Sequence, residues 1–237
     1  MKILITVINK QEAATLIKYG FDILDVKNPA EGSLGAPAPR VLKEIWDIVP
    51  DGRQRSIAVG DVPNLPGTVA LAALGALQFK PDYIKLGLRG ARNRQEAAVL
   101  VKEAVGAVDL AGGGAMVVAA GFADYCRVGS VAPLDIPAIA HESGASVGMI
   151  DTAIKDGKGL LDLMPLKEIE EFVRGCHAKN IKAAVAGSLD ETHIEKMAGI
   201  GVDIFGVRGA VCLNNDRNAD LDRSRIERIV SKIKGSA

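Results

Sequence analysis

Short apolar segments recur eight times along this chain, and an amphipathic stretch follows each of them. The segments are predicted as β-strands at residues 2–7, 22–27, 56–60, 82–87, 115–120, 147–151, 182–186 and 203–207. The following stretches are predicted as helices at residues 10–19, 39–48, 69–79, 94–108, 135–143, 166–179, 190–198 and 223–234. Eight strands that each precede a helix are the count of a (β/α)8 barrel. We therefore expect a single TIM-barrel domain over residues 1–237.

The composition favours this fold and argues against several other classes. Hydrophobic residues make up 48% of the chain and aromatic residues only 4%, which is typical of buried parallel strands covered by helices. The 29 basic and 29 acidic residues cancel, so no net charge favours nucleic acid as a partner. No apolar run reaches membrane length, and the opening run is too short for a signal segment. We expect a cytoplasmic protein without a membrane partner.

The first strand lacks the glycine fingerprint of a dinucleotide-binding fold, and no metal-binding spacing is visible. The three cysteines and three histidines are Cys126, Cys176, Cys212, His141, His177 and His193. We expect reduced, mostly buried thiols, and histidines with surface or packing roles. Neither a metal nor a cofactor is expected.

Charged side chains cluster at the predicted strand ends, where the active site of a TIM barrel lies. The candidates for catalysis are Asp25, Lys27, Lys85, Asp151 and Lys155. Asp25 and Lys27 lie two residues apart and so point to the same face of their strand. For that strand alone, an exposed ion pair on a solvated edge is the alternative. The recurrence of charged strand ends elsewhere favours a polar site.

Lysines at such a rim indicate amine chemistry. A lysine near other cations, or surrounded by apolar walls, has a lowered pKa and can form a Schiff base with a carbonyl substrate. Lys27 is predicted as the covalent nucleophile because Asp25 lies beside it, whereas Tyr83 takes that position beside Lys85. Asp25 or Asp151 is expected to carry protons, and Lys85 to act as acid or base. The alternative is that the lysines only bind negative charge.

Glycine-containing turns follow the last two strands, where barrels often bind phosphate. Gly187, Ser188, Arg208 and Gly209 are the candidate phosphate-binding residues, because glycine lets backbone amides approach an anion closely. Alternatively, these glycines only form tight turns. Residues 61–68 are expected either to fold over the site or to form a rigid proline turn.

Other segments carry weaker predictions. Gly20, Gly144 and Gly201 fit left-handed ends of helices, and Ser188 and Asp190 are plausible helix starts. The glycines at 112–114 are expected to form a flexible loop at the opposite rim. Residues 213–217 are assigned no role.

Seven motifs, spread from the second strand to the last, carry a specific resemblance to a known family. They are Asp25-Val26-Lys27-Asn28-Pro29 with Glu31-Gly32-Ser33-Leu34-Gly35, Val59-Gly60-Asp61-Val62-Pro63, Tyr83-Ile84-Lys85-Leu86-Gly87, Ala119-Ala120-Gly121-Phe122-Ala123-Asp124, Asp151-Thr152-Ala153-Ile154-Lys155-Asp156-Gly157-Lys158, Ala186-Gly187-Ser188 and Gly206-Val207-Arg208-Gly209-Ala210. In combination they resemble the (5-formylfuran-3-yl)methyl phosphate synthase family.

The resemblance implies a TIM-barrel lyase that condenses two glyceraldehyde 3-phosphate molecules into a phosphorylated furan aldehyde, with loss of phosphate and water. This reaction belongs to the biosynthesis of methanofuran and related C1 carriers. The resemblance implies that Lys27 forms the Schiff base and that Lys85 accepts a proton. Asp25, Asp151 and Lys155 match further positions of the family's site, with less defined roles.

The expected partners are a small-molecule triose phosphate and further copies of the chain in a homo-oligomer. Two alternatives remain at this stage. The first is a class I aldolase-type lyase that acts on another sugar phosphate. The second is a non-catalytic sensor of phosphorylated metabolites, which would not need an amine at position 27.

Overall fold

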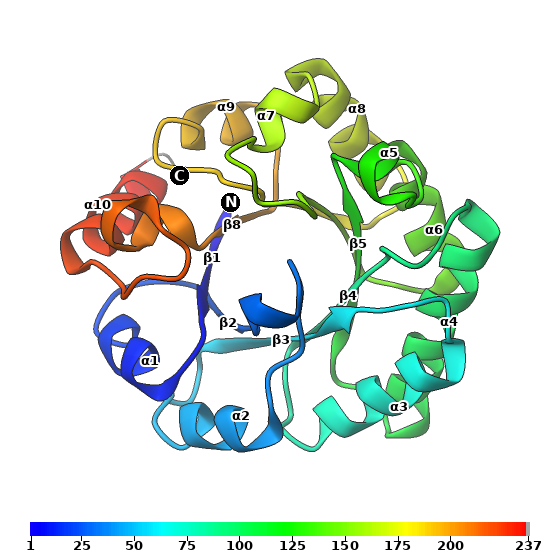
Figure 1. The fold of residues 1–237 in the computed structure, drawn as a ribbon, viewed down its shortest axis with the longest axis horizontal. Coiled ribbons are helices and arrows are strands. Elements are labelled where there is room, and N and C mark those ends of the chain that lie inside the picture. Colours follow the sequence, from blue (N-terminus) through cyan, green and yellow to red (C-terminus); the bar gives the residue numbers. More distant parts are fainter. Residues whose placement is uncertain (236–237) are drawn as a thin grey trace.

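The computed structural model describes residues 1–235 and has the predicted closed barrel (Figure 1). All eight strands are parallel, neighbours in the chain are neighbours in the sheet, and β8 pairs with β1 to close it. The strands are β1 (Lys2–Val7), β2 (Ile23–Val26), β3 (Gln54–Asp61), β4 (Tyr83–Gly87), β5 (Met116–Phe122), β6 (Val147–Asp151), β7 (Lys182–Val185) and β8 (Ile204–Val207).

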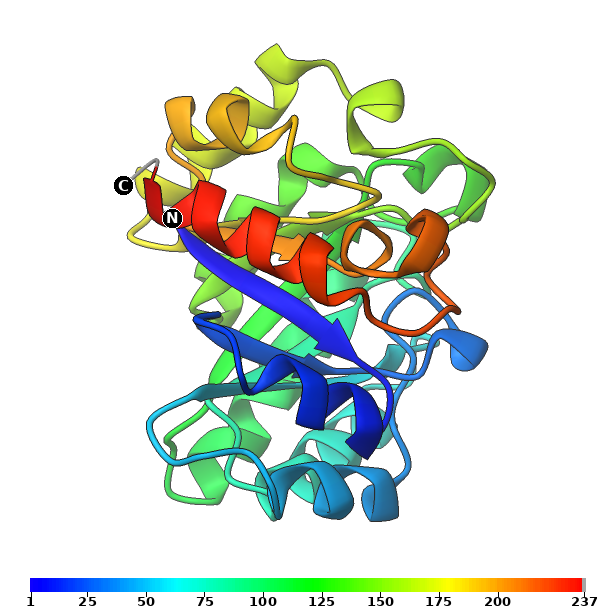
Figure 2. The same ribbon diagram turned by 90° about the vertical axis from the view of Figure 1, so that its left-hand side faces the viewer.

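Helices surround the barrel, and the last of them, α10, lies against β1 beside the start of the chain (Figure 2). The α-helices are α1 (Lys10–Leu16), α2 (Pro39–Trp46), α3 (Pro66–Leu77), α4 (Arg94–Leu110), α5 (Tyr125–Val128), α6 (Ile136–Ser143), α7 (Leu160–Leu163), α8 (Leu166–His177), α9 (Ile194–Gly199) and α10 (Arg223–Gly235). Four short 3₁₀ helices are η1 (Pro29–Glu31), η2 (Pro133–Asp135), η3 (Gly209–Val211) and η4 (Leu213–Asn215).

The strands bury both faces, so two apolar clusters form. On β1, Ile3, Ile5 and Val7 face the helices and belong to the larger outer cluster. Leu4, between them, belongs to a smaller cluster inside the barrel, because successive side chains of a strand point to opposite faces. This second cluster fills the barrel interior, and the polar site lies above it at the ends of the strands.

The helices bind to the barrel through apolar stripes. On α8 the buried residues are Ile169, Phe172, Val173 and Cys176, which recur every three or four positions and so lie on one side of the helix. Asn9 and Asn93 cap α1 and α4 by accepting a hydrogen bond from the backbone amide three residues later.

Several local predictions were wrong. Gly144 and Gly201 have the left-handed conformation expected of helix ends, with φ of 77° and 84°, but Gly20 does not. The helix after β7 starts at Ile194, later than expected. The Asp190 carboxylate accepts hydrogen bonds from the amide and hydroxyl of Thr192, so it stabilises a turn before the helix. Ser188 has φ of 54° and lies outside any helix.

The predictions for cysteine and histidine are confirmed. All three thiols are free, with Cys176 and Cys212 buried and Cys126 exposed. His177 lies 2.9 Å from Asp203 in an exposed pair, and His193 accepts a hydrogen bond from the Asp190 amide. Within residues 1–235, every helix is too short or too polar to cross a membrane.

Replacement of Gly144 by Ala is expected to lower the free energy of unfolding by roughly 1–2 kcal/mol, because an L-residue is strained at positive φ. The matched control is Gly199→Ala, at an exposed position where a Cβ would meet no atom within 4 Å. This control should leave stability unchanged or raise it by up to about 1 kcal/mol. Urea unfolding of both variants tests the expectation. Equal stability of the two would contradict it.

Candidate active site

One pocket of about 470 Å³ opens at the carboxyl ends of the strands. Its floor contains Lys27, Lys85 and Asp151, and Lys155 lines its side. The loops that follow β7 and β8 supply most of the other lining residues. Among the five predicted catalytic residues, only Asp25 does not line the pocket; it lies just beneath, where it contacts Lys85. The structure therefore brings all five together.

The pocket is off centre because the β2 loop (residues 27–38) covers part of the barrel mouth. Figure 1 shows this loop, with η1, crossing the middle of the barrel. The amides of Ser33 and Leu34 donate to the Asp61 carboxylate at 2.7 and 3.3 Å, and the Ser33 hydroxyl donates to the Thr152 carbonyl at 2.8 Å. Burial raises the pKa of Asp61, while these amides oppose the rise.

The segment at residues 61–68 is a turn and does not cover the pocket. The Val62 amide donates to the Gly87 carbonyl, and its own carbonyl accepts from Gly90. Pro66 then begins α3. Of the two alternatives for this segment, the rigid turn is therefore correct, and the cover is the β2 loop.

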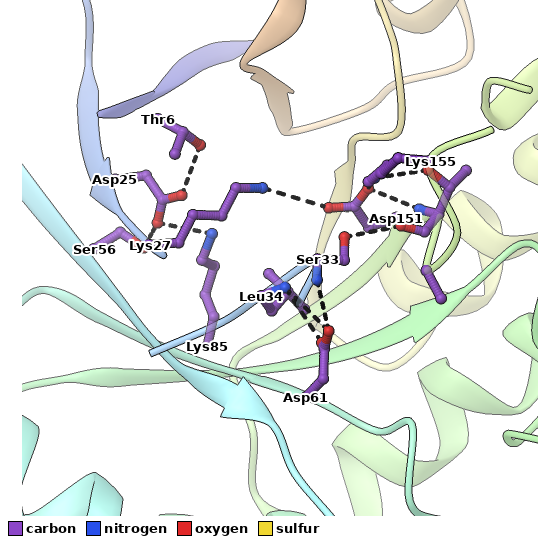
Figure 3. Close-up of polar contacts among 12 residues, drawn as sticks. Thr6, Asp25, Lys27, Ser33, Leu34, Ser56, Asp61, Lys85, Asp151 and Lys155 are labelled. Atoms are coloured by element: carbon purple, nitrogen blue, oxygen red, sulfur yellow. Dashed lines mark hydrogen bonds and ion pairs between the residues drawn. The ribbon is translucent and has the colours of Figure 1, made fainter. Parts of the chain in front are cut away.

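Asp25 and Lys85 form a fully buried ion pair inside the barrel (Figure 3). The Lys85 Nζ lies 2.7 Å from Asp25 Oδ1. The hydroxyls of Thr6 and Ser56 also donate to Asp25, at 2.9 and 2.8 Å. Both hydroxyls lie level with Asp25 because β1, β2 and β3 pair in register at these residues. A buried carboxylate needs such partners to remain charged.

Asp151 holds a second cluster of charges at the end of β6. Its carboxylate accepts from Lys155 Nζ at 2.9 Å and from the Thr152 amide at 2.7 Å. Burial alone would raise the pKa of Asp151, but Lys155 and Lys27 outweigh burial and hold that pKa well below its usual range. Asp151 is therefore an ionised acceptor at all physiological pH values.

Lys27 lies between the two clusters. Its side chain is 8% exposed, and its Nζ is 4.0 Å from Asp151. Within residues 1–235 this amine makes no hydrogen bond. Burial, with help from the charges of Lys85 and Lys155, lowers the pKa of Lys27 from 10.5 to about 8, although Asp151 opposes the shift. At pH 7 about a tenth of such amines are unprotonated, against roughly one in three thousand for an ordinary lysine.

The expected pairing of Asp25 with Lys27 is wrong. Asp25 and Lys27 do share a strand face, but the cation that contacts Asp25 comes from β4, because side chains of different strands converge inside a closed barrel. Lys85 therefore has the fixed carboxylate, and Tyr83 lies below it in the inner apolar cluster. The carboxylate nearest to the Lys27 amine is that of Asp151.

The two predicted phosphate loops do line the pocket. A Cβ on Gly187 would lie 2.9 Å from the Thr152 side chain, and Gly187 has φ of 106°, so this position requires glycine. The backbone amides of Ser188, Leu189, Gly209 and Ala210 donate no hydrogen bond to any residue of the described chain. These amides are available to an anion in the pocket.

Arg208 also lines the pocket, but its guanidinium already has partners. It forms a two-point ion pair with Glu12, at 2.5 and 2.9 Å, and donates further hydrogen bonds to the carbonyls of Thr6, Arg217 and Ala219. The side chain is 6% exposed. The positive charge of Arg208 is therefore neutralised by Glu12 inside the protein.

Sequence reasoning missed the hydroxyls of Thr6 and Ser56 and the carboxylate of Glu12. Thr6 and Ser56 do carry a signal, because each is a polar residue on the inward face of an apolar strand next to Asp25. Glu12 carries none, since its partner lies 196 residues away in the chain.

The fold and the pocket define a class: a TIM-barrel enzyme with buried lysine–carboxylate pairs at the carboxyl ends of its strands. Solved structures with the same fold include 3-hexulose-6-phosphate synthase from Salmonella typhimurium, with a TM-score of 0.66 and 17% identity over all of both chains. Phosphoribosyl anthranilate isomerase from Thermus thermophilus has a TM-score of 0.62 and 13% identity, also over all of both chains. At such identities the likeness concerns the fold alone.

Sequence comparisons specify the family. The family model described as 4-HFC-P synthase matches residues 3–230. The (5-formylfuran-3-yl)methyl phosphate synthase of Methanothermobacter thermautotrophicus is 49% identical, over 92% of each chain. That of Methanocaldococcus jannaschii is 46% identical, over 97% of this chain and 98% of the relative. The chain therefore belongs to the (5-formylfuran-3-yl)methyl phosphate synthase family, and it is an enzyme of furan phosphate biosynthesis.

Replacement of Lys27 by Met should flatten the pH dependence of stability in alkaline solution. The pKa of Lys27 is about 8 in the folded protein and near 10.5 in an unfolded chain, so between these values the unfolded chain binds more protons. Stability from this group therefore rises with pH in that window, by at most about 3 kcal/mol. The rise should be absent in Lys27→Met.

Urea unfolding at several pH values between 7 and 10.5 gives the comparison. Lys102 is an exposed lysine of α4, and Lys102→Met is the control that should run parallel to the unsubstituted protein. If Lys27→Met also runs parallel, the pKa of Lys27 is ordinary.

Proposed function

We propose that this enzyme condenses two glyceraldehyde 3-phosphate molecules into (5-formylfuran-3-yl)methyl phosphate through a Schiff base on Lys27. The atoms balance when one phosphate and two waters leave the two trioses. Membership of the family supports the product. The observation that carries the mechanism is Lys27, a buried amine on the pocket floor with a pKa of about 8.

Lys27 attacks the aldehyde carbon of one triose, and loss of water forms an iminium. The iminium withdraws electrons, so C2 loses a proton, and the resulting enamine expels the phosphate from C3. Loss of the C2 hydroxyl proton makes C3 nucleophilic, and C3 attacks the carbonyl of the second triose, which has isomerised to its ketose, to form the new carbon–carbon bond. The free hydroxyl of the ketose then closes the ring on C2 of the first triose, loss of two waters gives the aromatic ring, and hydrolysis of the imine releases the aldehyde.

Lys85 and Asp25 handle protons beneath the reacting carbons. Lys85 lines the pocket, and its partner Asp25 is fixed by two hydroxyls. The pair can take a proton from a carbon acid and return it to a leaving hydroxyl without contact with water. Asp151 and Lys155 form the corresponding pair on the other side of Lys27, near the amine that gains and loses protons during imine formation.

The loops after β7 and β8 bind substrate phosphate in this proposal. The free amides of Ser188, Leu189, Gly209 and Ala210 supply donors, and Lys155 supplies positive charge. Of the residues assigned to this role from sequence, Gly187, Ser188 and Gly209 keep it. The Arg208 guanidinium is bound to Glu12 and to backbone carbonyls, so it is not proposed to bind phosphate. The homo-oligomer and the cytoplasmic location remain predictions of the sequence.

Borohydride reduction during turnover should trap the imine on Lys27. We expect the unsubstituted enzyme to form the furan product from glyceraldehyde 3-phosphate alone and to gain a reduced adduct that peptide mass spectrometry places on Lys27. The adduct should be absent in Lys27→Arg, because a guanidinium does not form this imine. It should persist in Lys85→Gln, if imine formation does not need Lys85.

The outcomes separate the rival functions. Another condensation or cleavage product would favour an aldolase-type lyase on a different sugar phosphate. Ligand binding without turnover would favour a sensor. An adduct on Lys85 or Lys155 in the unsubstituted enzyme would reverse the assignment of the nucleophile.

Replacement of Asp25 by Asn should lower kcat by roughly 10²–10⁴-fold, because the buried proton carrier loses its charge. The imine at Lys27 should still be trapped. Ser56→Ala is the control, since it removes one hydrogen bond to Asp25 and keeps the carboxylate, and its effect on kcat should be much smaller. A normal kcat in a folded Asp25→Asn enzyme would exclude Asp25 from proton transfer.

A further inference from the structure

The β8 loop (residues 212–221) forms one wall of the pocket between η3 and α10. Asn215, Asp216, Arg217 and Asn218 line the cavity. The base of the loop is closed by an antiparallel bridge between Cys212 and Leu221 and by the hydrogen bond from the Leu213 amide to the Asp220 carbonyl, 3.0 Å. This wall is thus a closed, hydrogen-bonded structure.

Arg208 attaches this loop to the barrel. Its Nε donates to the Arg217 carbonyl at 2.8 Å, and its Nη2 donates to the Ala219 carbonyl at 3.3 Å. Glu12 in turn holds the Arg208 guanidinium from the other side. Through these bonds the backbone at Arg217 has a fixed place at the pocket wall.

The backbone at Arg217 lies next to the predicted phosphate-binding loop after β8. A Cβ on Gly209 would lie 3.0 Å from the Asn215 carbonyl oxygen and 3.9 Å from the Arg217 nitrogen. The backbone of Arg217 therefore runs beside Gly209, which lines the pocket and whose amide has no hydrogen bond within the described chain. A side chain at position 209 would push the two segments apart.

The guanidinium of Arg217 has no hydrogen-bond or ion-pair partner within residues 1–235. Its Nη2 is shielded from solvent and has no hydrogen bond to any residue of the described chain. By contrast, Arg208 is paired with Glu12, Lys85 with Asp25, and Lys155 with Asp151. A shielded, unpaired guanidinium nitrogen is unfavourable, so a selected sequence is expected to keep it only for a ligand.

The positive charge of Arg217 indicates that the ligand is an anion. Burial lowers the pKa of Arg217, and Arg208 lowers it further, while the charges of Asp151 and Asp61 oppose the shift. Neither carboxylate hydrogen-bonds to the guanidinium. A guanidinium presents a planar set of donors that matches the oxygens of a phosphate group.

We propose that Arg217 binds the phosphoryl group of the substrate, together with the free amides of the loops after β7 and β8. Arg217 supplies the positive charge that Arg208 cannot, because Arg208 is committed to Glu12. Arg208 is then a positioning residue, which holds the loop that carries Arg217. The assignment rests on the proposed function for the identity of the phosphate ester, a triose phosphate.

The test compares Arg217→Gln with Arg223→Gln, a matched control in which an exposed arginine of α10 outside the pocket loses the same charge. We expect Arg217→Gln to raise KM for glyceraldehyde 3-phosphate by about 10- to 100-fold. The fall in kcat should be smaller. Arg217→Lys should recover part of the loss. Arg223→Gln should behave like the unsubstituted enzyme.

Binding of inorganic phosphate gives a readout that does not depend on turnover. Phosphate should raise the melting temperature of the unsubstituted enzyme and of Arg223→Gln, and this rise should be lost in Arg217→Gln. Without phosphate, Arg217→Gln should melt at the same temperature as the unsubstituted enzyme or higher, because an unpaired guanidinium has been removed. A merely structural arginine would give a lower melting temperature.

The results distinguish this inference from the proposed function. If phosphate binding depends on Arg217 but no furan forms from glyceraldehyde 3-phosphate, the proposed reaction is wrong and the anion site stands. If furan forms and Arg217→Gln keeps both its KM and its phosphate-dependent melting, the role of Arg217 is wrong. Absence of any phosphate effect in the unsubstituted enzyme also overturns it.

Discussion

A carboxylate buried inside a closed barrel must be balanced by a cation from elsewhere in the chain, because water does not reach it. Asp25 satisfies this constraint with Lys85 from β4 and with the hydroxyls of Thr6 and Ser56 from the neighbouring strands. Lys85 and the two hydroxyls occupy both oxygens of Asp25. Lys27 is therefore left 4.0 Å from its nearest carboxylate, desolvated but loosely paired, which is the condition for a nucleophilic amine.

The loops determine where the pocket opens. The β2 loop is tied down by Asp61 and Thr152 over part of the mouth, so the opening is confined to the side where β6, β7, β8 and β1 end. On that side the loops with free amides and Arg217 line the same pocket as Lys27. The buried ion pairs hold the architecture, whereas the loosely paired amine of Lys27 and the guanidinium of Arg217 line the pocket.

The sequence predicted the features that depend on local pattern. Eight apolar segments with helices between them were enough to predict the barrel. Charged residues at the strand ends were enough to predict that the lysines lie at one site. The partner of Asp25 could not be predicted, because strand spacing along the chain does not say which side chains meet inside the barrel. The role of Arg208 was out of reach for the same reason, since Glu12 is 196 residues away. Arg217 has asparagine and aspartate neighbours in the sequence, a pattern typical of a solvated loop. Only the folded structure shows that its Nη2 is shielded from solvent.

The bond between Arg208 and Glu12 joins the two ends of the chain across the seam where β8 meets β1. During synthesis the ribosome delivers Lys27, Lys85 and Lys155 well before Arg208 and the loop that it anchors. Closure of so long a stretch of chain is a late event in folding, because distant contacts form at the highest entropic cost. A nascent chain thus carries the lysines of the pocket before it has the pocket wall formed by residues 212–221, and a chain truncated before residue 208 never acquires that wall.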